Sequence, residues 1–164
     1  MKDNDLCVRI NDGILNVRVG AIIVKNGRFL MVRNTKYGYY YSVGGRIKLG
    51  ESAERAVERE VEEETGVKMK VDRLAVVNEC FFYDLLPGNT KGKLIHELAF
   101  CFYMRVPEDF EPLPPSSVDL CDGEYLEWVS PDTPLTVYPD FFRRKCNDDS
   151  KMIEHIVIDE KEKR

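Results

Sequence analysis

The chain has 164 residues, 43% of them hydrophobic and 32% charged, and its formal net charge is −5. This length and composition predict a single folded domain, residues 1–164, and exclude a disordered chain. The mild acidity argues against binding to nucleic acid polymers, which need a basic face. The charge imbalance is local, because residues 51–66 hold seven Glu and two Arg while the rest of the chain is neutral.

The cysteine pattern predicts reduced thiols in a cytoplasmic protein, because the five cysteines are widely spaced and form no C-x-x-C pair. No apolar segment resembling a signal peptide follows Met1, and no apolar run approaches the ~20 residues that span a bilayer. We therefore expect no membrane partner. With only two histidines, any metal is expected to be held by oxygen atoms.

The first half of the chain predicts strands followed by a helix. Apolar residues predict strands at 17–24 and 29–32, joined by a turn into a hairpin. Residues 37–42 are aromatic and end at a Gly-Gly loop. Residues 52–65 predict a helix in which Ser52 caps the start and Gly66 marks the stop.

The second half predicts mostly strands, with loops between them. Strands are expected at 71–83, 94–105, 125–129 and 153–158, and a short helix within 140–145. Loops are expected at 87–92, 107–115 and 131–139. Together the elements predict an α/β or α+β fold with a mixed sheet covered by helices.

The predicted helix places carboxylates on its apolar side. At about 100° per residue, Glu60 and Glu64 fall within the apolar stripe and Glu63 lies on its edge. Arg59 is expected to lie to one side of this stripe, so few bases would neutralise the three acids. Buried carboxylates are costly unless paired, and a divalent cation such as Mg²⁺ or Mn²⁺ would offset their charge. The helix alone also fits a solvated Glu-rich face.

The segment from Gly45 to Val67 resembles the Nudix box, G-x5-E-x7-R-E-U-x-E-E-x-G-U, in which U is aliphatic. Every fixed position of that pattern is filled: Gly45, Glu51, Arg59, Glu60, Val61, Glu63, Glu64, Gly66 and Val67. The order of the flanking elements is also similar to the family. One departure is Val43, where many members have Pro before the two glycines.

The resemblance implies an α/β/α sandwich that hydrolyses the pyrophosphate bond of a nucleoside diphosphate linked to another group, assisted by Mg²⁺ or Mn²⁺. By position in the motif, Glu60, Glu63, Glu64 and the Gly45 carbonyl look like metal ligands. Glu60 is alternatively the general base. Glu51 and Arg59 look like a pair that orients these carboxylates.

Outside the box, several side chains are candidates for substrate binding, each with a structural alternative. Arg33 is a candidate phosphate contact or an exposed strand-end residue. Tyr41 and its neighbours Tyr37, Tyr39 and Tyr40 are candidates for stacking a base or for strand packing. Glu97 is a candidate acid at the metal site or an edge carboxylate. Asp122 and Glu124 lie where relatives often supply a late acid that binds metal or acts as base.

The substrate is weakly encoded. The resemblance leaves ADP-ribose-like compounds, dinucleoside polyphosphates and oxidised nucleoside triphosphates open. Phe82 stands where some ADP-ribose-cleaving relatives have Pro, whereas Tyr83 matches a Tyr found in some dinucleoside-polyphosphate-cleaving relatives. A regulatory module that binds a nucleotide without hydrolysing it is the competing function. Relatives are commonly dimers, so a homodimer is possible.

Overall fold

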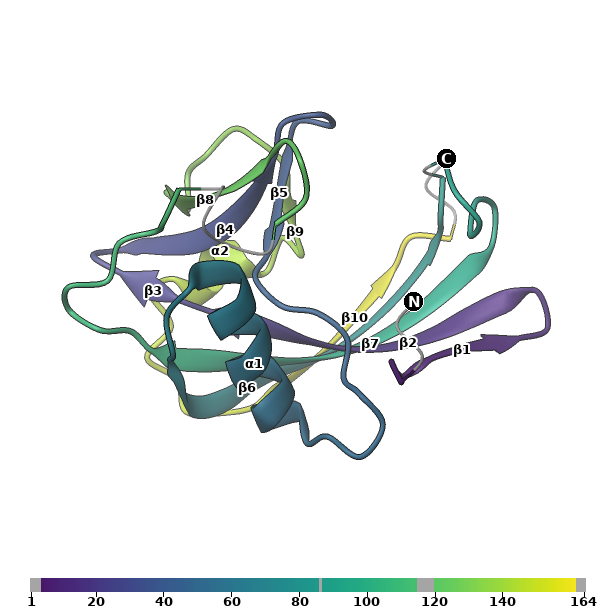
Figure 1. The fold of residues 1–164 in the computed structure, drawn as a ribbon, viewed down its shortest axis with the longest axis horizontal. Coiled ribbons are helices and arrows are strands. Elements are labelled where there is room, and N and C mark those ends of the chain that lie inside the picture. The colour runs from purple at the N-terminus through teal and green to yellow at the C-terminus, as the bar shows by residue number, and fades with distance from the viewer. Residues whose placement is uncertain (1–3, 86, 115–119, 162–164) are drawn as a thin grey trace.

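The fold is taken from a computed structural model, in which residues 4–85, 87–114 and 120–161 are described. Residues 1–3, and Pro115 at the end of one predicted loop, lie outside them. Figure 1 shows two curved sheets with helix α1 (Ala53–Thr65) in front of them. No helix in the described residues is both long and apolar enough to cross a membrane.

The first sheet has the strand order β1-β2-β7-β6-β10, and its long strands β2, β7 and β6 lie side by side. The bounds are β1 Cys7–Ile10, β2 Gly13–Ile22, β6 Lys70–Tyr83, β7 Leu94–Arg105 and β10 Glu154–Asp159. Pairing is parallel for β2–β7 and β10–β6 and antiparallel for β1–β2 and β6–β7. The predicted mixed sheet is therefore confirmed.

The second sheet has the order β3-β4-β5-β9, and β8 pairs with β4. The bounds are β3 Val24–Lys25, β4 Arg28–Asn34, β5 Tyr39–Ser42, β8 Glu124–Val129 and β9 Val137–Tyr138. The strand predicted at 17–24 is divided at Ile23, so β2 belongs to the first sheet and β3 to the second. The predicted hairpin turn is confirmed and joins β3 to β4.

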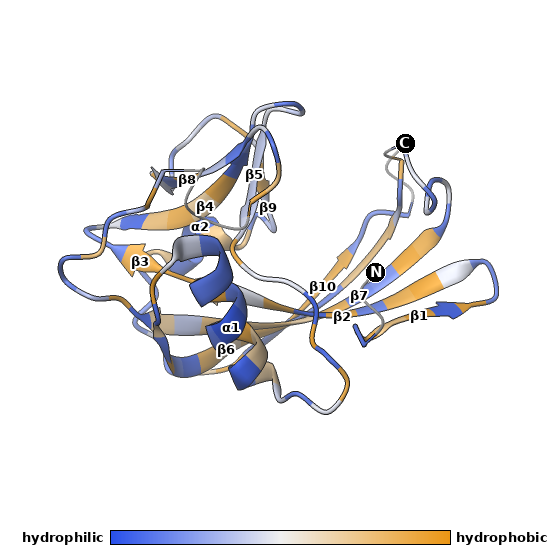
Figure 2. Cartoon of the chain, viewed as in Figure 1, coloured by the Kyte–Doolittle hydropathy of each residue, from blue (hydrophilic) through white to orange (hydrophobic). Residues whose placement is uncertain are grey.

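Helices cover both faces of the central strands. Val57 and Val61 of α1 pack in one core cluster with alternate residues of β2, β4 and β7. Phe142 of α2 (Phe142–Lys145) and the preceding Phe141 pack in a second cluster with the intervening residues of the same strands. Figure 2 shows α1 as largely hydrophilic beside these apolar strands. The α/β/α arrangement follows, because each central strand buries both of its faces.

Helix α1 begins and ends as predicted. The Ser52 hydroxyl accepts a hydrogen bond from the Arg55 N–H, and Gly66 ends the helix in the left-handed conformation, with its N–H bonded to the Glu62 carbonyl. These caps fix where the helix begins and ends. The packing of Val57 and Val61 in the core then determines which side of the helix carries each glutamate.

Two short strands were not predicted. β1 pairs with β2, and β9 lies within the predicted loop 131–139, where it runs parallel to β5. Four- and two-residue strands at sheet edges carry too few alternating residues to give a clear pattern in sequence.

Candidate active site

Arg59 links three carboxylates of the box. Its Nε and Nη2 donate to the two oxygens of Glu51 at 2.9 and 3.0 Å, and its Nη1 donates to Glu60 at 2.6 Å and lies 3.4 Å from Glu63. The hydrogen bond from Arg59 is the main cause that lowers the pKa of Glu51. The expectation that Arg59 lies to one side was wrong, because its long side chain reaches across one helical turn.

Glu64 stands apart from this cluster and is buried. Its side chain extends into the core side of α1, and its Oε2 has no hydrogen-bond partner in the described part of the chain. Burial, and secondarily the charge of Glu60, raises the pKa of Glu64 to about 8. A carboxylate that is withdrawn from water with one oxygen free is poised to accept a proton or a cation.

Two glycines let the chain pass close to these acids. Gly44 has φ +142°, and a side chain there would overlap the Val19 carbonyl. A Cβ on Gly45 would overlap the Glu60 carboxyl group. The Gly45 carbonyl, which the resemblance implies as a metal ligand, accepts a hydrogen bond from the Val19 N–H at 2.9 Å, so one of its two lone pairs is already used.

Two of the candidates outside the box lie next to Glu64. The Tyr41 hydroxyl donates to Glu124 at 2.8 Å, and Asn34 donates to the same carboxylate at 2.9 Å. Glu64 and Glu124 each raise the pKa of Tyr41, after the larger effect of its burial. Asp122 is exposed in the preceding turn, so Glu124 is the late acid that the fold brings to the site.

Arg33 lies on the other face of its strand. Its guanidinium group stacks on the Tyr40 ring at 4.9 Å, on the sheet face that packs in the second core cluster. Tyr40 donates to Glu127 at 2.7 Å. The structure therefore places Arg33 and Tyr40 away from the face that carries Tyr41 and Glu124.

Glu97 belongs to a polar cluster, with Asn16, Arg18 and Arg46, that was not predicted from the sequence. Asn16 donates to Glu97 at 2.9 Å and accepts from Arg46 at 2.9 Å, and Arg18 lies 3.7 Å from Glu97. Arg18 also lowers the pKa of Glu64. Arg18 is a charged residue inside the otherwise apolar run 17–24, and this was the signal that could have marked it as functional. Its partner Glu97 lies on the neighbouring strand β7.

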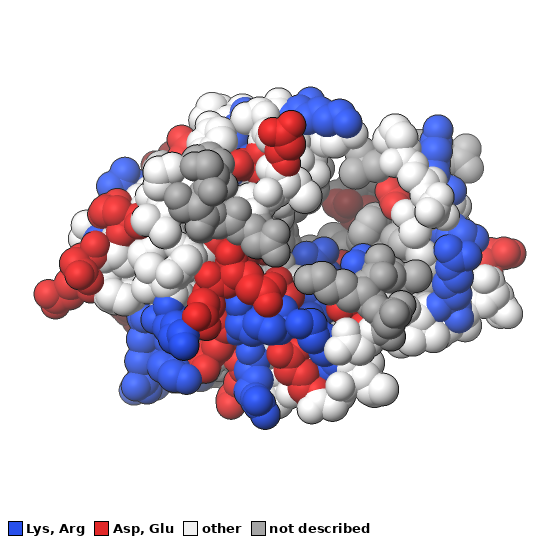
Figure 3. Space-filling model, viewed as in Figure 1, with Lys and Arg blue, Asp and Glu red and all other residues white. Residues whose placement is uncertain are grey.

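The acidic residues gather over α1 beside a hollow between the two sheets, as Figure 3 shows, with basic residues next to them. Among the described residues, no three His, Cys, Asp or Glu side chains are already arranged to hold a metal ion. Glu60 and Glu63 are instead held by Arg59.

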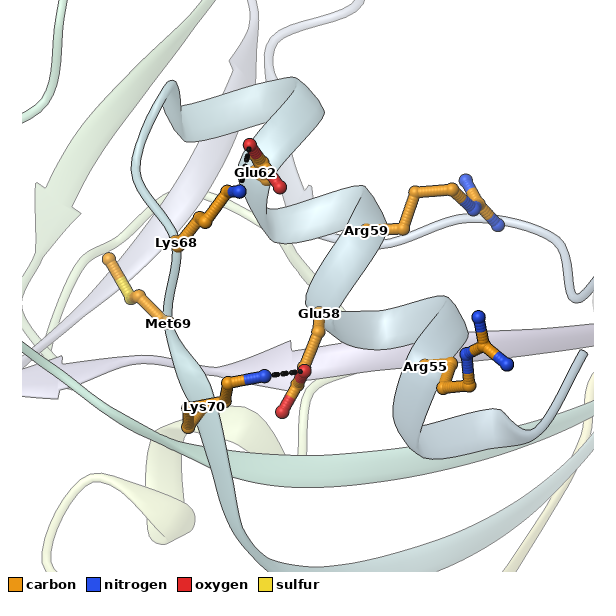
Figure 4. A pocket seen from close by; sticks show the side chains of 7 residues that line it. All are labelled: Arg55, Glu58, Arg59, Glu62, Lys68, Met69 and Lys70. Atoms are coloured by element: carbon orange, nitrogen blue, oxygen red, sulfur yellow. Dashed lines mark hydrogen bonds and ion pairs between the residues drawn. The ribbon is translucent and has the colours of Figure 1, made fainter.

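A separate pocket of about 240 Å³ lies on the other side of α1 and does not contain these acids. Figure 4 shows its lining: Arg55, Glu58, Arg59, Glu62, Lys68, Met69 and Lys70. Its two acids are already paired, Glu58 with Lys70 at 2.7 Å and Glu62 with Lys68 at 3.6 Å. We therefore place the candidate active site on the side of Glu64.

The raised pKa of Glu64 predicts a pH-dependent stability in metal-free protein. The folded state holds a proton on Glu64 up to about pH 8, whereas an unfolded Glu releases it near its ordinary pKa. Stability from this group is therefore complete at low pH and is lost as the pH rises towards 8. Between pH 5.5 and 7.5, we expect wild type to lose about 2 kcal/mol relative to Glu64→Gln. Urea unfolding with a chelator present measures this difference, and parallel pH profiles would contradict it.

The fold and the site together define a mixed α+β domain whose helix α1 carries an arginine-linked cluster of glutamates beside two sheets. A family model for the NUDIX domain matches residues 15–156. The chain therefore belongs to the Nudix hydrolase family, which confirms the assignment made from the box.

Sequence relatives match over a limited region. A MutT-like protein of Streptomyces ambofaciens is 40% identical over 58 residues, which are 35% of this chain and 38% of the relative. The NAD-capped RNA hydrolase NudC of Actinobacillus succinogenes is 45% identical over 58 residues, 35% of this chain and 22% of the relative. The matches thus span well under half of these curated relatives.

Solved structures support the fold over most of the chain. The MutT mutator protein from Bacillus halodurans superposes with a TM-score of 0.64 at 22% identity, covering 87% of this chain and 89% of that one. An ADP-ribose pyrophosphatase from Streptococcus suis gives a TM-score of 0.51 at 15% identity, covering 87% and 98%.

Proposed function

We propose that this chain is a metal-dependent pyrophosphohydrolase that cleaves a nucleoside diphosphate joined to a second group. The observation that carries the proposal is the buried Glu64 carboxylate, whose Oε2 has no partner in the described residues although Glu60 and Glu124 add negative charge around it. An anionic substrate can approach such a site only if cations offset that charge.

The residues present fit Mg²⁺ or Mn²⁺. Glu60, Glu63 and Glu64 supply hard oxygen donors on adjoining turns of α1, and the Gly45 carbonyl retains a second lone pair. Arg59 contacts Glu63 at 3.4 Å, a weaker contact than its 2.6 Å bond to Glu60. Glu63 is therefore the carboxylate that Arg59 most readily releases to an ion.

Hydrolysis transfers a phosphoryl group to water. The oxygen of water forms a bond to one phosphorus of the bridge, the bond from that phosphorus to the bridging oxygen breaks, and two phosphate-bearing products leave. A divalent cation held by the glutamates would offset the diphosphate charge and make the attacking water more acidic. A carboxylate of the site accepts the proton, and Glu60 and Glu124 are the candidates. Arg59 holds Glu60 in place through its 2.6 Å bond.

Arg18 is proposed to bind the diphosphate. Its side chain is 33% exposed, lies beside Glu97 at 3.7 Å, and is near enough to Glu64 to lower the pKa of that carboxyl. We expect Arg18→Ala to raise KM about tenfold with a smaller effect on kcat, because one charge-assisted contact is lost. Steady-state kinetics measure this split. Arg105→Ala, which removes a 70% exposed arginine paired with Asp72, is the control and should leave KM unchanged. Equal KM values for the Arg18→Ala and Arg105→Ala variants would show that Arg18 does not bind the substrate.

A substrate panel tests the proposed function directly. Purified protein with Mg²⁺ or Mn²⁺ is incubated with ADP-ribose, nucleotide sugars, dinucleoside polyphosphates and oxidised nucleoside triphosphates, and the products are separated. We expect cleavage within the phosphate bridge of at least one compound, abolished by a chelator. Tight binding of one compound without cleavage of any would favour the regulatory module instead.

A further inference from the structure

A row of tyrosines runs from the carboxylate site to the surface, and we propose that it stacks a second nucleobase, so that the preferred substrates carry a base on both sides of the phosphate bridge. The row consists of Tyr41, Tyr39, Tyr37 and Tyr138 and is here called the tyrosine row. The inference rests on the proposed function, because it specifies which substrates reach the same site.

The inner end of the row lies at the active site. Tyr41 donates to Glu124 at 2.8 Å, and the charge of Glu64 acts on its hydroxyl group. Glu124 also acts on the next residue of the row, since it raises the pKa of Tyr39 after burial of that ring. A ligand whose phosphates lie beside Glu64 therefore has aromatic rings directly adjacent to it.

The rings follow one another at near-equal steps. The centroids of Tyr41 and Tyr39 are 6.2 Å apart, and those of Tyr39 and Tyr37 are 6.3 Å apart with planes inclined by 10°. Tyr39 and Tyr41 lie on β5, where alternate residues face the same side, and Tyr37 lies in the turn that precedes this strand. Tyr138 reaches the row from β9 and meets Tyr39 edge-on at 5.4 Å. The four rings come from β5, the turn before it and β9, and each contacts at least one other ring of the row.

The outer end of the row is open to solvent. Tyr37 is 43% exposed and Tyr138 is 48% exposed, which is high for rings that already contact other rings. Packing within the sheet explains Tyr41, whose ring contacts the first core cluster, but it leaves the outer two rings without a structural role. Exposed aromatic faces stack bases of any sequence, and each stacked base contributes about 1–3 kcal/mol.

Charge at the outer end suits a ligand with further phosphates. The Lys36 ammonium group lies 5.0 Å from the centroid of Tyr37. Tyr37 lies two ring spacings beyond Tyr41, where a base offers a whole π face for stacking and a sugar offers only C–H contacts. A second nucleoside, connected through the phosphate bridge, presents both a base for the rings and a negative charge for Lys36.

Binding and kinetics of matched variants test the proposal. Tyr37→Ala and Tyr138→Ala remove exposed rings, so folding is not at risk, and Tyr37→Phe and Tyr138→Phe retain the rings without the hydroxyl groups. Calorimetry gives Kd for a one-base ligand, ADP-ribose, and for a two-base ligand, diadenosine tetraphosphate, with Ca²⁺ present. KM for the same two compounds is measured with Mg²⁺.

We expect each Ala variant to weaken binding of the two-base ligand about tenfold, leave ADP-ribose binding unchanged and raise KM only for the two-base compound. Each Phe variant should behave like wild type. Equal losses for both ligands, or no loss for either, would overturn the tyrosine row as a second-base site. If neither compound is cleaved but the Ala variants still weaken binding of the two-base ligand alone, the tyrosine row is supported as a second-base site and the proposed hydrolysis is contradicted.

Discussion

Glu64→Gln is expected to lower turnover about a thousandfold while leaving the fold intact. The substitution keeps the size of the side chain but removes the negative charge that a divalent cation requires, and such ions contribute several kcal/mol of transition-state stabilisation. A second measurement is independent of activity. Millimolar Mg²⁺ or Mn²⁺ should raise the Tm of wild type, because a ligand that binds only the folded state stabilises it, and should not raise the Tm of the variant.

The matched control is Glu62→Gln on the same helix. The Glu62 side chain is 49% exposed and pairs with Lys68 at 3.6 Å, so the same chemical change is made outside the active site. This control should retain both turnover and the metal-dependent rise in Tm. Near-normal turnover of Glu64→Gln would refute the metal-site assignment.

Arg59→Ala is expected to reduce both turnover and stability. It leaves Glu51 and Glu60 without their main partner in a half-buried setting, where their side chains are 16% and 15% exposed. We expect the free energy of unfolding to fall by about 2–3 kcal/mol, and turnover to fall about a hundredfold because the metal-binding carboxylates lose their support. Urea unfolding and steady-state kinetics measure the two effects.

Two substitutions show which property of Arg59 matters. Arg59→Lys keeps the charge but cannot make the paired bonds to both oxygens of Glu51, so it should recover stability better than turnover. Arg55→Ala removes an exposed arginine from the same helix and should change neither. A fully active Arg59→Ala protein would show that the cluster has no role in catalysis.

The sequence was sufficient to predict the helix and its acids. Ser52 and Gly66 are strong local signals, and the spacing of Glu60, Glu63 and Glu64 is a property of one helix, so no distant contact was needed. The long strands at 71–83 and 94–105 were also confirmed, because their alternation extends over enough residues to be distinctive.

What the sequence did not predict depends on contacts between distant residues. The resemblance implied the pair of Glu51 and Arg59, but the contacts of Arg59 with Glu60 and Glu63 depend on how its side chain folds back, which helical periodicity does not specify. The cluster of Arg18 and Glu97 forms only because β2 and β7 pair in parallel with Asn16 opposite Glu97. Similarly, Tyr138 joins the tyrosine row through a two-residue strand that was expected to be a loop.

The site requires a glycine at position 45 because of the space available there, and not because of any charge. Because the Glu60 carboxyl group occupies the space that a Cβ on Gly45 would take, even a single methyl group would displace this acid while every carboxylate of the box remained in the sequence. The position of Glu60 in the site therefore depends on a glycine at position 45 as well as on Arg59. In judging whether a Nudix box is functional, the space that its first glycine leaves for a glutamate carboxyl group therefore matters as much as the glutamates themselves.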